Sequence, residues 1–207
     1  MKKIITLFAA LLAAAALFAQ TPDEIIARMD QETDRFGPEG FSMYFELKIP
    51  ILGTAGTTVT MLGDKYKMVT DVKGNSLMHW TDGQSEWGYD SGKKEVVITT
   101  AKPSEESQAE NNVKMLKGVT DGYDVKIKKE TDEAWYLVCT KSRTNPNKDD
   151  PKKMELTISK STYLPISVKS SLKGVTLTMR DFAIGATEAD VTFNPADFPG
   201  VQIIDKR

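Results

Sequence analysis

Hydrophobic and polar side chains alternate with a period of two through most of the chain between Gly40 and Phe193. In the clearest run, residues 41–49, every second side chain from Phe41 to Ile49 is apolar and those between are Ser, Tyr, Glu and Lys. Successive side chains of a β-strand point to opposite faces, so this run predicts a strand with one apolar face. A sheet built from many such strands has more apolar face than two short helices can cover.

The same pattern predicts a single antiparallel sheet of about 11 strands. Turn pairs such as Gly63-Asp64, Asp82-Gly83 and Ser91-Gly92 separate neighbouring runs and indicate short hairpins. The tail after Phe193 is rich in proline and is predicted as a short edge element. The predicted strands are 41–49, 56–62, 65–72, 76–81, 85–90, 93–100, 123–129, 135–141, 152–159, 164–171 and 175–184.

Two segments have helical rather than strand periodicity. The first begins with Thr21 as N-cap, has Glu24 placed to complete a capping box, and is predicted to stop at Gly37-Pro38. The second, residues 103–117, is polar in its first half, so we expect it to pack loosely. The apolar stripes are Ile25, Ile26, Met29 and Phe36 in the first helix, and Ala109, Val113 and Leu116 in the second.

The N-terminus has the pattern of a secretory signal peptide. Lys2 and Lys3 precede an uncharged apolar run, 4–18, and Ala19-Gln20 provides a small residue at a cleavage position. The apolar run is shorter than the roughly 20 residues of a membrane anchor, and no cysteine follows it that could be lipid-modified. We therefore expect residues 1–19 to be removed and residues 20–207 to form one exported, periplasmic domain.

Charge and cysteine content limit the binding partners and the covalent cross-links that the chain can have. Removal of Lys2 and Lys3 leaves 25 basic residues against 29 acidic ones, a net charge of −4. This balance favours neither nucleic acid nor an anionic membrane surface as a partner. Cys139 is the only cysteine, so no internal disulfide is expected, and its apolar neighbours predict a small buried side chain.

A search for catalytic groups finds no constellation. The only histidine, His79, lies within a strand pattern and has no Gly-x-Ser-x-Gly nucleophile to serve, so a structural role is the favoured interpretation. One Cys and one His cannot make a zinc or copper site. Adjacent carboxylates such as Glu105 and Glu106 lie in polar stretches, where solvated side chains are expected. We expect no enzymatic activity, no metal and no cofactor.

The number of methionines is the unusual feature among the apolar residues. Surfaces that accept varied apolar ligands are often rich in this flexible side chain, although an ordinary packed sandwich core explains it as well, and composition alone favours the core. Six of the nine methionines fall in predicted strands: Met43, Met61, Met68, Met78, Met154 and Met179.

Two stretches carry a resemblance to a known family. Residues 80–90, Trp-Thr-Asp-Gly-Gln-Ser-Glu-Trp-Gly-Tyr-Asp, resemble the strand–Asp-Gly–strand hairpin of LolA-like outer-membrane lipoprotein carriers. Residues 191–205 are similar to the C-terminal Phe…Pro…Gly-Val…Asp ending of that family. The order of elements, the length and the signal peptide agree with this resemblance over the whole mature chain.

The resemblance implies a curved, half-open antiparallel barrel whose concave face holds the acyl chains of a lipoprotein beneath a helical lid. A Met-rich and aromatic lining suits acyl chains of different lengths. The implied lid residues are Val113, Met115 and Leu116. The implied cavity residues are Met43, Phe45, Leu47, Val59, Met61, Tyr66, Met68, Met78, Trp80, Trp87, Tyr89, Leu156, Ile158, Leu177 and Met179.

The family also implies partners: an inner-membrane lipoprotein-releasing complex and an outer-membrane acceptor, with the carrier acting as a monomer. The best-known carriers have an arginine ahead of the third strand that takes part in cargo release, whereas the corresponding position here is near Lys65. A lipid- or lipoprotein-sensing module of envelope-stress regulation, which uses the same fold, is the alternative function. An enzyme of lipid or glycan chemistry is the third, and the residue search argues against it.

Overall fold

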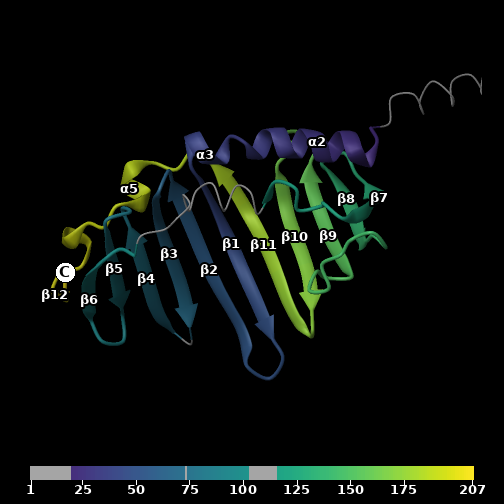
Figure 1. Ribbon diagram of the computed structural model, residues 1–207. Helices are drawn as coiled ribbons and strands as arrows, with labels where there is room; N and C mark the ends of the chain where they lie inside the picture. The colour runs from purple at the N-terminus through teal and green to yellow at the C-terminus, as the bar shows by residue number, and fades with distance from the viewer. Residues whose placement is uncertain (1–19, 73, 103–115) are drawn as a thin grey trace, which may run out of the picture.

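A computed structural model describes residues 20–72, 74–102 and 116–207, which form one strongly curved, open sheet of 12 strands (Figure 1). The strands follow the order β12-β6-β5-β4-β3-β2-β1-β11-β10-β9-β8-β7, and all neighbours are antiparallel except β12 and β6. The bounds are β1 Phe41–Ile49, β2 Gly53–Leu62, β3 Lys65–Val72, β4 Asn75–Thr81, β5 Ser85–Asp90, β6 Glu95–Thr100, β7 Tyr123–Glu130, β8 Ala134–Lys141, β9 Lys153–Ser159, β10 Pro165–Leu172, β11 Val175–Ile184 and β12 Gln202–Asp205.

The sheet confirms the predicted fold class and the predicted strands, with small shifts of their ends. The largest shift is in β2, which begins at Gly53 rather than at residue 56. The proline-rich tail contributes the edge strand β12, which pairs in parallel with β6 from Gln202 to Asp205. This pairing places the C-terminus beside the middle of the chain.

The first helix begins as predicted but ends earlier. In α2 (Pro22–Thr33), the Thr21 hydroxyl accepts from the Glu24 amide at 3.3 Å, and the Glu24 carboxylate accepts from the Thr21 amide at 2.9 Å. A separate short helix, α3 (Phe36–Glu39), follows and contains the Gly and Pro expected to stop the first one, since proline is tolerated in a first helical turn. Gly40 then turns the chain into β1 at φ +70°, where a Cβ would lie 2.7 Å from the Met61 carbonyl.

Two other predictions concern residues outside the described ranges. The signal peptide at 1–19 is one of them. The second helix, predicted over 103–117, lies outside them except for its last two residues. Leu116, within that end, is 1% exposed and belongs to the main core.

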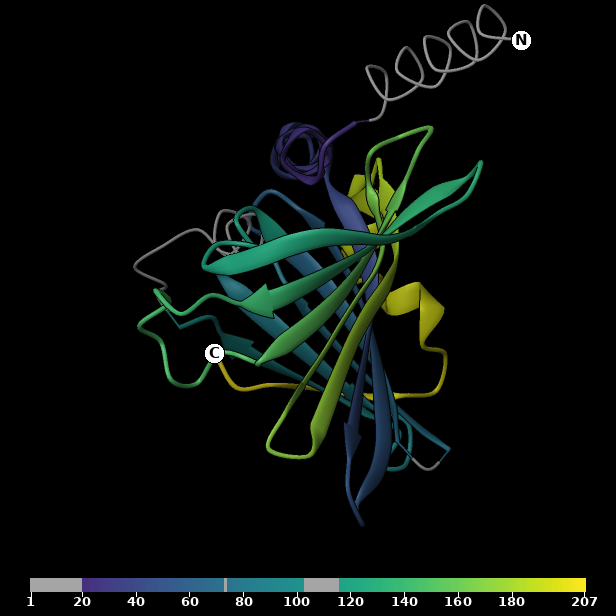
Figure 2. The same ribbon diagram turned by 90° about the vertical axis from the view of Figure 1, so that its right-hand side faces the viewer.

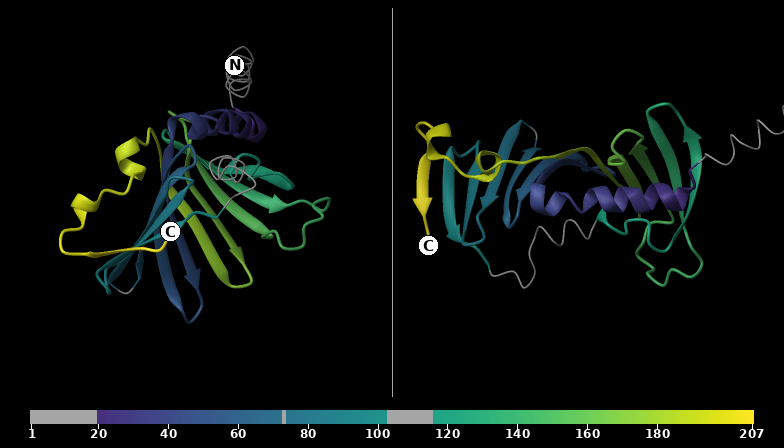
Figure 3. Two further views of the ribbon diagram at one scale, coloured as in Figure 1. Left: turned by 60° about the vertical axis from the view of Figure 1, so that its left-hand side comes forward. Right: turned by 90° about the horizontal axis from the view of Figure 1, so that it is seen from above.

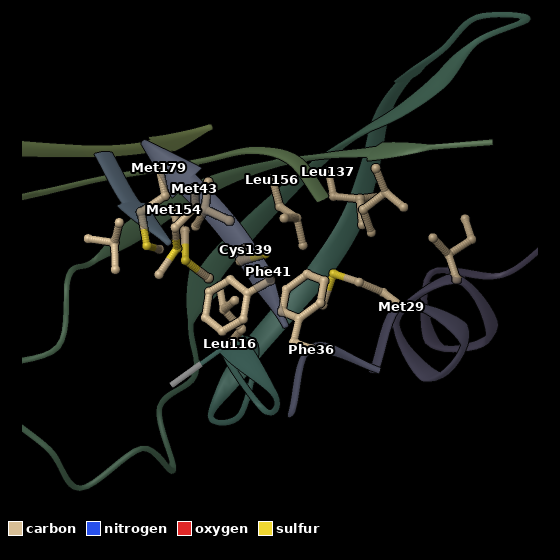
Figure 4. Close-up of a cluster of buried hydrophobic side chains, with 14 of the residues drawn as sticks. Met29, Phe36, Phe41, Met43, Leu116, Leu137, Cys139, Met154, Leu156 and Met179 are labelled. Carbon is tan, nitrogen blue, oxygen red and sulfur yellow. The ribbon is translucent and has the colours of Figure 1, made fainter. Parts of the chain in front are cut away.

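The main core lies on the concave face of the sheet, where α2 and α3 cross it (Figures 2 and 4). It is built from one face of β1–β3 and of β7–β11, together with Ile25 and Met29 of α2 and Phe36 of α3. Residues that pair directly across antiparallel strands share a face, so the pairs Met43–Val59, Met61–Tyr66 and Leu137–Leu156 extend this face from strand to strand.

A second core lies on the opposite, convex face of β4–β6. The C-terminal segment crosses that face through α5 (Glu188–Val191) and the 3-10 turn η1 (Pro195–Asp197), on the other side of the sheet from α2 (Figure 3). Phe193 and Phe198 of this segment contact the rings of Trp80, Trp87 and Tyr89 at centroid distances between 4.7 and 5.9 Å. Buried core residues therefore lie on both faces of one sheet.

Candidate functional site

The concave face carries an apolar surface, called the groove below, that is covered at the α3 end and exposed at the other. Along β1, Phe41 and Met43 are each 1% exposed, Phe45 is half-buried, and Leu47 is 37% exposed. These side chains all point to the same face, which becomes more exposed from Phe41 to Leu47, and the next residue on it, Ile49, is half-buried.

The neighbouring strands show the same gradient. In β3, Tyr66 is buried, Met68 is half-buried and Val72 is exposed, and in β11 Met179 is buried while Leu177 is half-buried. Leu47 pairs with Leu177, and Phe45 pairs with Met179, so β1 and β11 form a continuous apolar floor. The more exposed part of this floor is a surface on which an apolar ligand could lie.

Apolar side chains of the two N-terminal helices cover the closed end. Ile25, Met29 and Phe36 are each no more than 1% exposed, and the Phe36 ring stacks on Phe41 at 4.8 Å (Figure 4). Burial of each such side chain is worth about 1.5–3 kcal/mol. The hydrophobic effect therefore supplies most of the energy that holds this cover on the sheet.

Polar side chains add only weak ties to the cover. Lys117 pairs with Asp34 at 2.7 Å, and about half of each side chain is exposed. The guanidinium of Arg28, in the middle of α2, lies 5.2 Å from the centre of the Tyr163 ring. Exposed ion pairs typically contribute 0–1 kcal/mol, so these ties orient the cover more than they fix it.

A polar wall borders the apolar floor on β3–β5. The Tyr66 hydroxyl lies 3.3 Å from Nδ1 of His79, and Nε2 of His79 lies 3.7 Å from the Glu86 carboxylate. Burial, with a smaller contribution from the Glu86 charge, raises the pKa of Tyr66, so its hydroxyl stays protonated and able to donate. This wall offers hydrogen-bond partners to a polar group beside an apolar ligand.

The described residues offer no group of three or more His, Cys, Asp or Glu side chains placed to hold a metal ion. Cys139 is fully buried in the main core, as the sequence predicts, and burial raises its pKa to about 11. A thiol with this pKa is almost entirely protonated at neutral pH and is a poor nucleophile.

Of the predicted cavity residues, 11 share the concave face with the groove. They are Met43, Phe45, Leu47, Val59, Met61, Tyr66, Met68, Leu156, Ile158, Leu177 and Met179. The concave face also contains buried side chains that the prediction omitted, although they alternate in the same way within predicted strands: Trp135, Leu137, Met154 and Val168.

The other four predicted residues, Met78, Trp80, Trp87 and Tyr89, lie on the convex face and do not line the groove. Met68 pairs with His79, so the side chain of the preceding Met78 points to the other side of the sheet. Trp80 pairs with Trp87, and Met78 pairs with Tyr89, which keeps all four on that face. Their place in the predicted single cavity is therefore corrected.

The predicted lid is described only at Leu116, which packs in the main core, because Val113 and Met115 lie outside the described residues. Lys65, considered as a substitute for the release arginine, pairs with Glu188 of α5 at 2.7 Å. Its neighbour Tyr66 faces the groove, so Lys65 points to the convex face and does not bring its charge to the cover.

Comparison with solved structures identifies the fold. LprF from Mycobacterium bovis superposes with a TM-score of 0.52 at 13% identity, over 84% of this chain and 98% of that one. The LolA superfamily protein NE2245 from Nitrosomonas europaea gives 0.34 at 12% identity, over 86% and 100% of the two chains. MucB of Pseudomonas aeruginosa, solved in complex with MucA, gives 0.40 at 13% identity, over 83% and 60%.

No protein-family model matches the sequence, and no curated protein shows a significant match. The likeness therefore concerns the fold. Within the described part of the chain, no helix is both long enough and apolar enough to cross a membrane.

Proposed function

Because the chain has a LolA-like fold, we propose that it is a periplasmic carrier that binds the acyl chains of lipoproteins in the concave groove. The observation that carries this proposal is the gradient along β1, from a fully covered Phe41 to an exposed Leu47 on one continuous apolar face. An inner-membrane complex would supply the lipoprotein and an outer-membrane acceptor would take it. The protein would act as a monomer, by binding rather than by catalysis.

The energetics of the groove suit a cargo that must be released. Each methylene group moved from water into the groove gains about 0.8 kcal/mol, so one acyl chain can displace side chains of the cover. Ile25, Met29 and Phe36 would then lose contacts that the acyl chain replaces. A cover whose closed and open states differ by a few kcal/mol permits both loading and release.

The first test asks what the protein carries. We expect mass spectrometry of the protein purified from cells to find an acylated molecule, and the purified protein to take up a lipoprotein released from inner membranes. A protein that carries no acylated ligand and takes up no lipoprotein would refute the carrier function. An empty groove together with a co-purifying membrane-spanning anti-sigma factor would support the sensing alternative.

The second test uses two half-buried methionines on neighbouring strands. Met68 faces the groove and Met78 faces away from it. We expect Met68→Glu to weaken the binding of a fluorescent fatty-acid probe by at least about tenfold, because a carboxylate in the groove must be desolvated. Met78→Glu is the matched control and should leave probe affinity unchanged. Equal loss in both variants would show that the concave face is not the binding surface.

A further inference from the structure

The hairpin between β1 and β2 ends in two exposed apolar side chains, Ile51 and Leu52. Ile51 is 106% exposed and Leu52 is 77% exposed, the highest values among the large apolar residues of the described chain. Figure 1 shows that this hairpin extends farther from the sheet than the other hairpins at the same end. Exposed apolar side chains at the tip of a ribbon cost solubility and do nothing for the folded state.

The backbone conformation at this tip is also unusual. Ile51 has φ +71°, in the left-handed region where glycine or asparagine is the usual residue and a β-branched side chain is strained. Gly53, two residues later, also has a positive φ, +101°, and as a glycine it adopts this conformation without strain. Ile51 thus combines a strained backbone with a fully exposed side chain, and packing within the folded domain does not account for an isoleucine here.

Basic side chains lie beside the tip. The β10–β11 turn adjoins the β1–β2 turn, since a Cβ on Gly174 would lie 3.4 Å from Cγ of Pro50. The adjacent Lys173 is one of five lysines around an open depression of 580 Å³, which also contains the carboxylates of Asp150 and Glu155. Lys173 pairs with Asp149 at 3.2 Å, so three carboxylates in total oppose the five lysines. The lysines are Lys148, Lys152, Lys153, Lys169 and Lys173.

We propose that the β1–β2 hairpin docks this protein on lipid bilayers with anionic headgroups, with Ile51 and Leu52 inserted among the lipids and the lysine-lined depression facing the phosphates. The net charge, −2 for the full sequence and −4 without residues 1–19, argues against such a partner for the protein as a whole, but the fold gathers a local excess of positive charge next to the apolar tip. Lysine side chains near an anionic surface attract it within about one Debye length, roughly 10 Å.

A bilayer fits this surface better than a protein partner does. A specific protein interface buries about 800 Å² per partner and needs an extended complementary patch. The tip offers two apolar side chains between the exposed polar residues Lys48 and Thr54, which is the arrangement of an interfacial anchor. The concave groove opens toward the same end through Leu47 and Ile49, so docking would bring the open end of the groove to the lipid.

The test measures sedimentation of the purified protein with vesicles of phosphatidylcholine alone or mixed with phosphatidylglycerol. We expect binding to the mixed vesicles that weakens with salt. The double variant Ile51→Asn, Leu52→Ser should bind at least about tenfold more weakly, because two apolar side chains no longer enter the lipid. Asparagine suits the backbone at position 51, so this variant should fold. Lys148→Gln with Lys152→Gln should lose about fivefold or more of the preference for anionic vesicles.

A matched control replaces two apolar side chains that are exposed elsewhere. Ile166→Asn with Ile203→Ser removes residues that are 44% and 46% exposed, and vesicle binding should not change. Failure of the protein to bind either vesicle, or equal binding by the tip variant, would overturn the proposal. The tip variant should keep its affinity for a fatty-acid probe without vesicles, and Met68→Glu should keep vesicle binding. The two proposals can therefore fail separately.

Discussion

The two faces of this sheet are both covered, but by different means. On the convex face, the C-terminal segment is joined to the sheet by the backbone pairing of β12 with β6, and the Arg207 guanidinium donates to the Ser85 hydroxyl at 3.1 Å. On the concave face, α2 and α3 reach the sheet through the side chains described above, chiefly Ile25, Met29 and Phe36.

The difference indicates which face can open. Removing the convex cover would break a ladder of backbone hydrogen bonds and expose Trp80 and Val96, whereas moving α2 would expose mainly apolar side chains, with Thr33 as a buried polar one. This contrast fits the proposed function, in which the convex face stays closed and the concave face exchanges one apolar partner for another. The predictions below test this contrast, beginning with the largest effect.

The strongest test removes one large ring from each core. Phe41→Ala and Trp80→Ala should each lower the free energy of unfolding by about 3–5 kcal/mol, because both side chains are almost fully buried. Urea unfolding followed by circular dichroism measures this loss. Only Phe41→Ala should also weaken binding of a fatty-acid probe under conditions where both variants are folded. Loss of binding in Trp80→Ala would show that the two cores act as one.

A milder test compares half-buried aromatic residues. Phe45 lies on the groove floor opposite Met179, and Trp87 stacks on Phe193 at 5.9 Å on the other face. Phe45→Ala should reduce affinity for the probe by about tenfold, since it removes apolar contact worth roughly 1.5–3 kcal/mol when fully covered. Trp87→Ala should leave affinity intact. Titration of the probe into each folded variant provides the measurement, and an unchanged affinity in Phe45→Ala would place the site elsewhere.

Most of the sheet could be predicted from the sequence, because alternation marks each strand and turn residues mark its ends. The face that each strand presents could not be predicted from alternation alone. Leu77, His79 and Thr81 alternate with Met78 and Trp80, and hydrophobicity alone predicts that Met78 and Trp80 share a face with the apolar side chains of β3. A shift of one residue in pairing exchanges the two sets completely.

Turn length contains the missing information. Two residues separate Val72 from Asn75, so these two pair, and counting back along both strands pairs Met68 with His79 rather than with Met78. The same count through the next turn pairs Trp80 with Trp87. The register of the strands was therefore enough to predict that these rings lie on the convex face. It could not predict the segment that covers them, because the contacts of Phe193 and Phe198 with these rings join residues about a hundred positions apart.

A third prediction compares the helix caps of the two covers. Thr21→Ala removes the capping box of α2 and should cost about 1 kcal/mol of stability. Because α2 is held by side chains, its amides should exchange with solvent faster, as measured by hydrogen–deuterium exchange. Thr187→Ala removes a hydrogen bond to Asp190 at the start of α5 and is the control on the other face. It should leave exchange in α2 unchanged, and a rise there would contradict independent covers.

The smallest expected effect is on the pH dependence of stability, which should have opposite signs in the concave cover, α2, and in the convex cover, α5. In α2, burial raises the pKa of Asp30, whose Oδ1 is buried without a hydrogen-bond partner in the described structure. The native state therefore prefers protonated Asp30, so stability from this group is present in acid and is lost as pH rises through its pKa. Asp30→Asn should raise stability at neutral pH by a few tenths of a kcal/mol, discounted for partial exposure, and should have no effect in acid.

At the start of α5, hydrogen bonds from Thr187 lower the pKa of Asp190 below its usual range. Stability from this group is present at neutral pH and is lost as pH falls through that lowered pKa. Acidification should therefore slow exchange of α2 amides relative to those of α5, after correction for the intrinsic pH dependence of exchange. Parallel trends in the two covers, or a trend in α2 that persists in Asp30→Asn, would mean that other groups control how the concave face opens.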